Sequence, residues 1–492
     1  MDDHHHHITL KDLPPDGERL DFSRVAKLAF TLLGVGILGL LGSVYFFLNS
    51  NETLRASFSF SWLLAIFYVF TIACGGLFWT LLHHATNSGW GIAVRRIMES
   101  VGNMIPVIGV LAIPFLLPKV QHDLWKWTEI ESKAIARAED PARIAKYEND
   151  YDAKVRAAEK MKADAAAAGQ NAEVVMAEKE LAYLATHKPD KNTILMAELG
   201  DHEHGDAILA KKYAYLNTTK PWGLYGRFIA YFLLLTAVIK ILRMWSFAQD
   251  KTGDVKNTFL ARRWACGFLP IFALCLTFAA IDWVKAVNHH WFSTMWGVYI
   301  FAGAAGSSMS IIVLIITWLR GHGHLKNIVN EEHYHVMGKF MFAFTVFWAY
   351  IAFSQFFLIW YANITEETAW YLTRNTETYN TLNIALVIVR FVIPFVLLLP
   401  AWVKRTPRYL AAMACYILCV HALDHYLLII PQRGPNVTGW TNWYVPGASF
   451  GDVVAFVTVV CLVAGSYILS LRKGSLYACR DPRLMESLHL HN

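Results

Sequence analysis

Ionisable side chains that could transfer protons lie inside long apolar segments of this chain. His421, Asp424 and His425 fall at positions i, i+3 and i+4, which places them on one face of a helix. Arg390 lies near the middle of another apolar segment and needs a buried partner, for which Asp424 is the nearest candidate. Charges inside a membrane segment are costly, so these residues are candidates for function. Imidazoles titrate near neutral pH, and burial raises the pKa of a carboxyl group toward neutral pH. Both kinds of group therefore fit proton transfer.

A wider outer group of polar residues lies near the ends that we assign to the extracytoplasmic side. Within it, Asp282, Lys285 and His289 follow at i, i+3 and i+7, which again favours one helical face. The outer group comprises Asp282, Lys285, His289, Gln355, Tyr361, Arg390, His421, Asp424, His425 and Asp452. Either it conducts protons, or one of its clusters binds a quinone headgroup. In the second case a His or Tyr would bond one quinone oxygen and an Asp would accept the proton.

An inner group of ionisable residues lies near the opposite ends of the same segments. Its members are His83, His84, Arg95, Arg96, Glu99 and Lys240. Together the two groups predict proton access from each side of a membrane. The competing interpretation is that residues at the membrane edges extend into water or form structural ion pairs. We expect no metal at His421 and His425, because the HExxH pattern of zinc enzymes is missing.

Composition predicts an all-α polytopic membrane protein. Hydrophobic residues make up 55% of the chain, charged residues 17%, and the mean hydropathy is +0.34. Ordinary globular chains carry about 25% charged residues. A helix needs about 20 apolar residues to cross a bilayer. About ten segments qualify, at residues 26–48, 57–82, 92–118, 222–246, 263–285, 292–319, 338–362, 381–402, 407–430 and 449–471.

The distribution of Lys and Arg predicts the orientation. The two tails and the loops after the second, fourth, sixth and eighth segments hold 20 of these residues, whereas the opposite short loops hold four. The positive-inside rule therefore places both termini in the cytoplasm. The formal charge of +6 reflects these loops and gives no reason to expect nucleic-acid binding.

One large soluble element separates the third and fourth spanning segments. It is rich in Ala, Lys, Glu and Asp, and we expect one or two exposed helices, with a hairpin break near Gly169 and no apolar core. It is either a docking arm for an extracytoplasmic partner or an insertion of no consequence. The expected parts are a cytoplasmic N-terminal segment (1–25), spanning helices one to three (26–118), the periplasmic insertion (119–221), helices four to ten (222–471) and a cytoplasmic tail (472–492).

Cysteine spacing argues against a redox centre on this chain. None of the seven cysteines forms a CxxCH motif, and no run has iron–sulfur spacing. The chain is therefore expected to carry no covalently bound cofactor.

Four runs of sequence resemble one family of membrane subunits. The run from His83 to Glu99 (HHATNSGWGIAVRRIME) resembles the connection between helices two and three in the NrfD-like, polysulfide-reductase C-type subunits of alternative complex III. The run from Gly338 to Asn363 is similar to the ActF-type subunit of that family, as are residues 212–217 (KYAYLN) and 290–297 (HWFSTMWG). The likeness covers nearly all ten predicted helices, but not the insertion at residues 120–200 or the tail beyond residue 475.

This resemblance implies both a fold and a function. The family fold has two four-helix bundles, helices 2–5 and 6–9, flanked by helices 1 and 10. The family complex lies in the bacterial inner membrane, oxidises menaquinol or ubiquinol, and passes electrons through an iron–sulfur subunit and a multihaem cytochrome c subunit beside a paralogous NrfD-like subunit. This chain would contribute a quinone site, a proton path, or both. An ion-coupled transporter and a purely structural membrane anchor remain alternatives.

Overall fold

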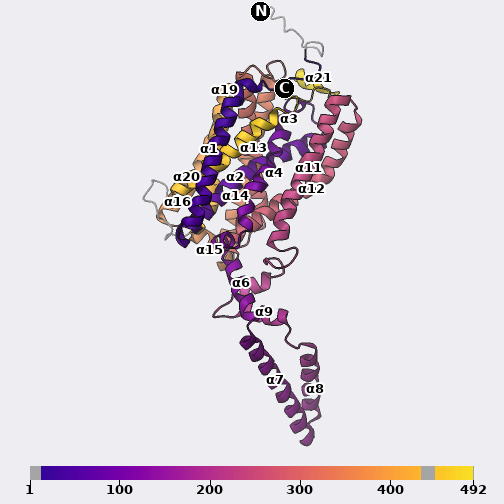
Figure 1. Cartoon of the computed structure of the whole chain (residues 1–492), viewed down its shortest axis with the longest axis vertical. Helices are drawn as coiled ribbons and strands as arrows, with labels where there is room; N and C mark the ends of the chain where they lie inside the picture. The colour runs from indigo at the N-terminus through magenta and orange to yellow at the C-terminus, as the bar shows by residue number, and fades with distance from the viewer. Residues whose placement is uncertain (1–12, 434–448, 491–492) are drawn as a thin grey trace, which may run out of the picture. The chain divides into compact units, whose positions relative to one another are not determined.

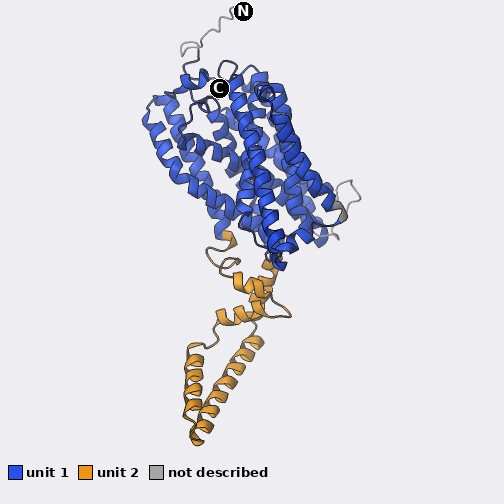
Figure 2. Cartoon of the chain, turned by 180° about the vertical axis from the view of Figure 1, so that it is seen from behind, with its two compact units in different colours: residues 1–124, 226–492 blue, residues 125–225 orange. Residues whose placement is uncertain are grey.

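The protein folds almost entirely into helices. A computed structural model describes residues 13–433 and 449–490. Helices make up 80% of it, and the described residues form no β-strand apart from one isolated bridge between Arg19 and Ser475. The predicted all-α class is therefore confirmed. Contacts divide the chain into two compact units, unit 1 (residues 1–124 and 226–492) and unit 2 (residues 125–225), which Figure 2 shows in different colours.

Nine helical segments of the described chain are long and apolar enough to cross a membrane (Figure 1). They are α1 (Phe22–Asn49), α2 (Glu52–Ala85), α11 (Leu224–Thr252), α12 (Lys256–Trp283), α13 (Trp296–Gly321), α14 (Glu331–Ala362), the continuous run of α16 (Glu377–Val387), η4 (Ile388–Val392) and α17 (Ile393–Leu398), α19 (Pro407–Ile429) and α20 (Phe450–Leu471). Shorter pieces are α5 (Pro118–Leu124), η3 (Lys285–Asn288), α15 (Thr365–Leu372), α18 (Ala401–Arg405), η5 (Ile430–Arg433) and α21 (Leu484–Leu488). These helices agree with a polytopic membrane protein.

The third predicted span is not one continuous helix. It is divided into α3 (Ile92–Gly102), α4 (Ile105–Leu111) and the short 3-10 turn η2 (Ile113–Leu116). Pro106 and Pro114 lie at the starts of the second and third pieces, where their missing N–H groups cost no helical hydrogen bond. The segment nevertheless runs the length of α2. Near its start the Arg95 guanidinium lies 3.5 Å from His83, and just after its end Asp123 bonds Arg55 at the other end of α2. We therefore count it as the tenth crossing.

Two central helices, α2 and α13, pack closely along unit 1. A Cβ atom at Gly75 of α2 would lie 2.3 Å from the carbonyl oxygen of Ala304, so only glycine allows this approach. The indole of Trp79 donates to the Ala305 carbonyl at 3.0 Å across the same contact. Small residues at a membrane helix interface let backbones approach, which replaces the hydrophobic drive that lipid surroundings do not supply.

The other spanning helices pack around α2 and α13. The broken third span and α12 pack on α2, and α11 bonds both α3 and α12 through polar side chains. On the other side α14 and α19 pack on α13, and the α16–α17 run packs on α14 and α19. Helix α1 lies along α20, which in turn packs on α2. This arrangement agrees with two groups of four helices flanked by the first and last.

Both described ends of the chain lie at the same end of unit 1. The backbone N–H of Leu476 donates to the Glu18 carbonyl at 2.7 Å, which joins the C-terminal tail to the segment before α1. Asp481 of the same tail bonds Arg95 at the start of α3. An even number of crossings explains this arrangement. The assignment of that end to the cytoplasm stays a prediction.

Unit 2 is a helical arm with a small base. Its helices are α6 (Lys126–Ala138), α7 (Pro141–Ala167), α8 (Asn171–Thr186), α9 (Lys191–Gly200) and α10 (Ala207–Lys212). The predicted hairpin is confirmed, because α7 and α8 pair and Gly169 takes a positive φ of 68° in the turn between them. At the base α6, α9 and α10 pack together and bury Leu199 and Leu209. The expectation that this segment has no apolar core is therefore wrong for its base.

Candidate functional site

The structure brings together an acid, a base and a cation in the second group of four helices. Asp424 on α19 is 2% exposed. Its Oδ2 lies 3.2 Å from the Arg390 guanidinium, and its Oδ1 accepts a hydrogen bond from the Tyr299 hydroxyl on α13. The predicted pairing of Arg390 with Asp424 is confirmed. We call Asp424, Arg390, Tyr299, His421 and His425 the Asp424 cluster.

Local backbone geometry places Arg390 at the centre of this cluster. Arg390 lies in the π-helical turn η4, one turn before Pro394. A proline cannot donate to the carbonyl four residues earlier, and π turns inside helices are frequent at functional sites. A Cβ atom at Gly303 of α13 would lie 2.9 Å from Arg390 Nη2, so glycine leaves room for the guanidinium. The guanidinium also lies over the Trp348 ring, 4.5 Å from its centroid.

The two histidines of the cluster differ in their hydrogen bonds, and the bonds assign their tautomers. Arg390 donates toward His421 Nδ1 at 3.3 Å, so the His421 hydrogen lies on Nε2 and points to Thr71 Oγ1 at 3.1 Å. His425 Nδ1 lies 2.9 Å from the His421 carbonyl and must donate to it. The lone pair of His425 is then on Nε2. Its nearest hydroxyl, Thr71, is 3.5 Å away and already donates to the Tyr68 carbonyl. His425 Nε2 is therefore the available proton acceptor of the cluster.

A small cavity adjoins the cation of the cluster. Its volume is about 20 Å³, enough for one water molecule. Arg390, Trp348 and Ser307 contribute to its wall. The Ser307 hydroxyl has no hydrogen-bond partner among the described residues, so the cavity offers a polar contact to a water. The cavity touches the Asp424 cluster at Arg390 and is not lined by Asp424 or His425, so a water there would contact the cation of the cluster.

The same side chains do not fit a metal ion. His421, Asp424 and His425 do place ligand atoms within 4.8 Å of one another. However, the Arg390 guanidinium lies against two of these ligands, at 3.2 Å from Asp424 and 3.3 Å from His421. A fixed positive charge at this distance repels a metal cation.

A buried arginine fixes the C-terminal end of α19. The Arg374 guanidinium donates to the Leu427 carbonyl at 3.1 Å and the Leu428 carbonyl at 2.8 Å, and it lies 3.3 Å from the centroid of the Trp370 ring. Cations at helix C-termini satisfy carbonyls that have no helical partner. Burial lowers the pKa of Arg374 to about 9. Arg374 thus holds the helix end only two residues beyond His425.

A second Arg–Asp pair lies in the first group of four helices. Asp282 on α12 is 1% exposed, and the Arg227 guanidinium bonds both of its oxygens, at 2.8 and 3.1 Å. The Tyr231 hydroxyl adds a third hydrogen bond at 2.7 Å. The expected continuation of this face is wrong, because α12 ends at Trp283 and Lys285 begins the 3-10 turn η3. His289 follows that turn and packs on His290 instead of continuing an α-helical face.

The other members of the outer group lie apart from the Asp424 cluster. Asp452 begins α20 and is bonded by both terminal nitrogens of Arg433, at 2.9 and 3.1 Å, and by Ser61. Gln355 is buried on α14. Tyr361 is 78% exposed and stacks on Phe357, away from the buried cluster. Its part in a quinone site or proton path stays a prediction.

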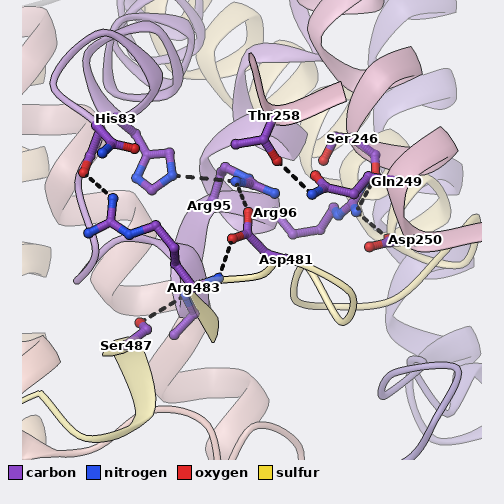
Figure 3. Close-up of polar contacts among 12 residues, drawn as sticks. His83, Arg95, Arg96, Ser246, Gln249, Asp250, Thr258, Asp481, Arg483 and Ser487 are labelled. Atoms are coloured by element: carbon purple, nitrogen blue, oxygen red, sulfur yellow. Dashed lines mark hydrogen bonds and ion pairs between the residues drawn. The ribbon is translucent and has the colours of Figure 1, made fainter. Parts of the chain in front are cut away.

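The inner group forms a network at the end of unit 1 where both chain ends lie (Figure 3). Arg95 and Arg96 each lie 3.4 Å from Glu99, which is fully buried. Arg95 also bonds Asp481 at 2.8 Å, and Arg96 pairs with Asp250. The Ser246 hydroxyl donates to Glu99 at 2.8 Å. Arg243 lies beside this network and bonds Ser100. The three guanidiniums are thus matched by the three carboxylates of Glu99, Asp250 and Asp481, and the network is charge-balanced.

The C-terminal tail closes this inner network. Asp481 supplies one carboxylate, and the Arg483 guanidinium donates to the Asn87 carbonyl. His83 and His84 are buried beside it, each with one ring nitrogen that has no hydrogen-bond partner among the described residues. Lys240 is exposed and bonds Asn103 at 2.8 Å, outside this network. The inner group therefore holds helices and tail together at one end.

Sequence reasoning found the ionisable residues but missed most of their partners. Tyr299, Arg227 and Asp250 are partners in these sites, yet each lies in a different segment from the residue it contacts. Arg433 was apparent only as a loop charge, and Asp481 lies in the tail. One local hint of such a partner was present in the sequence. Arg227 and Tyr231 lie one turn apart near the start of a predicted spanning helix.

Neither comparison with known proteins yields a relative. No protein-family model matches the chain, and no curated protein sequence matches it. The architecture of a membrane protein and the geometry of the clusters therefore carry the functional argument.

Proposed function

We propose that this chain is an integral membrane subunit of a quinol:cytochrome c oxidoreductase of the alternative complex III type, and that its Asp424 cluster transfers protons within that complex. The observation that carries the proposal is one guanidinium, Arg390, that contacts a buried carboxyl group and a buried histidine and also adjoins a water-sized cavity, with the available lone pair of His425 in the same cluster. The resemblance of the runs at residues 83–99 and 338–363 to ActF-type subunits supports it.

The cluster can hold and release a proton without an electron carrier of its own. The Arg390 guanidinium lies 3.2 Å from Asp424, and the Tyr299 hydroxyl donates to the same carboxyl group. A proton that arrives at His425 Nε2 creates a second cation near Arg390, so the arrangement favours its onward release. A group that accepts a proton and is then repelled by a fixed charge suits transfer better than storage.

The partners in this proposal are the paralogous NrfD-like subunit, the iron–sulfur subunit and the multihaem cytochrome c subunit. Those partners would hold the haems and clusters, since this chain has no CxxCH motif. Quinol, as menaquinol or ubiquinol, would supply the electrons and protons. The bacterial inner membrane, with both tails in the cytoplasm and unit 2 in the periplasm, is part of the same proposal.

Purification tests the subunit assignment directly. A tag on this chain, used to isolate the protein from the membranes of its source, should co-purify c-type haem and iron, and the material should reduce cytochrome c when quinol is added. Isolation of the chain alone, without haem, would contradict the proposal. The charge-balanced inner network would then favour a structural anchor.

A transporter is less well supported by the backbone. Ion-coupled transporters often have discontinuous helices at corresponding positions of two repeats. Here the breaks occur in the second helix of one group, at the end of α3, and in the third helix of the other, at η4. The breaks do not correspond, which favours the subunit assignment. Substrate-dependent ion uptake by proteoliposomes of the isolated chain would reverse this preference.

A further inference from the structure

Arg374 carries a buried positive charge that no carboxylate of the described chain balances. It is 5% exposed, and its guanidinium bonds only oxygens that carry no formal charge. These acceptors are the carbonyls of Trp370, Leu427 and Leu428 and the hydroxyl of Thr373. The titratable groups that interact with it are the tyrosines Tyr299, Tyr371 and Tyr379. Burying a cation without a countercharge is costly, and helix carbonyls supply only partial negative charge.

Other buried arginines of unit 1 differ from Arg374 in this respect. Arg227, Arg390 and Arg433 each lie against an aspartate, at 2.8, 3.2 and 2.9 Å. The end of a helix can be capped by any hydrogen-bond donor, so capping α19 does not by itself require a charged one. A pKa of about 9 leaves the Arg374 guanidinium charged at neutral pH. The uncompensated charge therefore calls for a role beyond the cap.

This charge lies at the end of unit 1 opposite to the chain termini, which we call the far end. Just before α19 begins, Arg405 pairs at 3.1 Å with Glu332 at the start of α14. Asn330, which precedes α14, bonds the Leu488 carbonyl of the C-terminal tail at 3.4 Å. The start of α19 is therefore at the end where the termini lie, and its C-terminal end, with Arg374, is at the far end.

Arg374 also lies next in line after the Asp424 cluster. The Leu428 carbonyl that it bonds at 2.8 Å belongs to the fourth residue after Asp424, about one helical turn along α19. Tyr299, which donates to Asp424, is among the groups that interact with Arg374. A proton that moves from the cluster along α19 toward the far end thus approaches a fixed positive charge. In membrane channels, fixed arginines exclude protons and other cations by electrostatic repulsion.

We propose that Arg374 is an electrostatic barrier that closes the Asp424 cluster to protons at the far end of unit 1 in the absence of turnover. The inference rests on the proposed function, because it concerns the cluster that would transfer the protons. It gives the resting cluster access from one side only, whereas the two groups of ionisable residues in the sequence predict access from both. A membrane that holds a proton gradient needs such a barrier, since an open path would dissipate the gradient.

Passive proton flux tests the barrier. The purified protein is placed in liposomes that contain the pH-sensitive dye pyranine, with potassium and valinomycin to hold the voltage at zero. A pH step is then applied without quinol. Arg374→Gln keeps a hydrogen-bond donor but loses the charge, so proton flux per protein should rise about tenfold. Arg374→Lys loses the planar guanidinium equally but keeps the charge, so its flux should stay close to that of the unchanged protein.

Two further variants separate a barrier from general damage to the bundle. Arg227→Gln removes a buried cation from the first group of helices and should not increase the flux. Combining Asp424→Asn with Arg374→Gln should abolish the increase, because the protons would pass through the cluster. Equal flux in Arg374→Gln and Arg374→Lys would overturn the inference. So would a leak of the same size in Arg227→Gln, or a leak that persists when Asp424 is replaced.

The same experiment distinguishes this inference from the proposed function. Passive flux needs neither quinol nor partner subunits, so it can be measured whether or not haem co-purifies. If haem co-purifies but Arg374→Gln stays as tight as the unchanged protein, only the barrier is contradicted. If the chain is isolated without haem but Arg374→Gln leaks and Arg374→Lys does not, the barrier holds and only the assignment to an oxidoreductase is contradicted.

Discussion

The two groups of four helices each bury one Arg–Asp pair, and the pairs differ in what surrounds them. In both groups the arginine lies on the third helix and the aspartate toward the C-terminal end of the fourth, with a tyrosine hydroxyl on the carboxylate. Asp282 receives two guanidinium bonds from Arg227. Asp424 receives only one close guanidinium contact, because Arg390 also bonds His421. The Arg227–Asp282 pair is therefore saturated, in the sense that one guanidinium bonds both carboxylate oxygens. The Arg390 guanidinium is instead shared between Asp424 and His421.

The neighbouring residues extend this difference. The residue after Asp282 is Trp283, which is fully buried and packs 4.8 Å from the Phe70 ring. The residue after Asp424 is His425, whose Nε2 has an available lone pair, and a water-sized cavity adjoins Arg390. Because Arg227 holds both oxygens of Asp282, that pair suits helix packing. A shared cation beside a base and a cavity can also change its protonation, so the comparison assigns structure to one pair and proton transfer to the other.

The largest expected effect comes from removing the acid of the cluster. In D424N, with Arg390 retained, the rate of quinol oxidation and of the proton release that accompanies it should fall about a hundredfold, because a positioned acid or base contributes on the order of 10²–10⁴ in rate. The measurement is stopped-flow proton release from proteoliposomes of the purified complex, normalised to assembled complex. D282N is the matched control and should keep its turnover per complex. If D424N released protons as fast as the unchanged protein, proton transfer could not be assigned to the Asp424 cluster.

A large loss of stability is expected from breaking the saturated pair. R227M leaves Asp282 buried without its cation. The free energy of unfolding should fall by about 3–5 kcal/mol, since an unpaired buried charge is strongly unfavourable. The thermal unfolding midpoint of the purified protein measures it. The double variant R227M/D282L removes both charges and should recover most of the loss with turnover intact. By contrast, R390M/D424L should recover stability but not turnover. Equal recovery of turnover in both doubles would contradict the assignment.

The base of the cluster gives a more selective test. H425Q keeps a donor for the His421 carbonyl but cannot take up a proton, so the rate of proton release should fall about tenfold while the unfolding midpoint stays close to that of the unchanged protein. H84Q, a buried histidine of the inner network, is the control and should leave the rate of proton release unchanged. A loss of stability without a change in the rate of proton release would make His425 a packing residue.

The smallest expected effect concerns the position of the cation. G303A places a methyl group 2.9 Å from Arg390 Nη2, so the guanidinium must shift away from Asp424 or His421. We expect the free energy of unfolding to fall by about 1–3 kcal/mol and the rate of proton release to fall modestly. G75A, at the α2–α13 contact, should lose stability with no specific change in the rate of proton release per complex. Identical behaviour of the two variants would show that Gly303 serves packing alone.

Local spacing in the sequence was enough to place one face of the candidate site. His421, Asp424 and His425 share a helix face because their separations match the helical period, and the structure keeps them together. The same reasoning failed for Lys285 and His289, since α12 ends before them. Spacing also did not reveal that Tyr361 is exposed, because it does not show which faces other helices cover.

The sequence by itself determined the all-α class, the membrane-crossing segments and the buried ionisable residues, because apolar length and helical period are local properties. Only the tertiary structure decided which charges are saturated, through partners such as Arg227, Tyr299 and Asp481 that lie on other segments. Such contacts depend on how helices pack across long separations in the chain. The same packing created the cavity at Arg390, which no local pattern specifies.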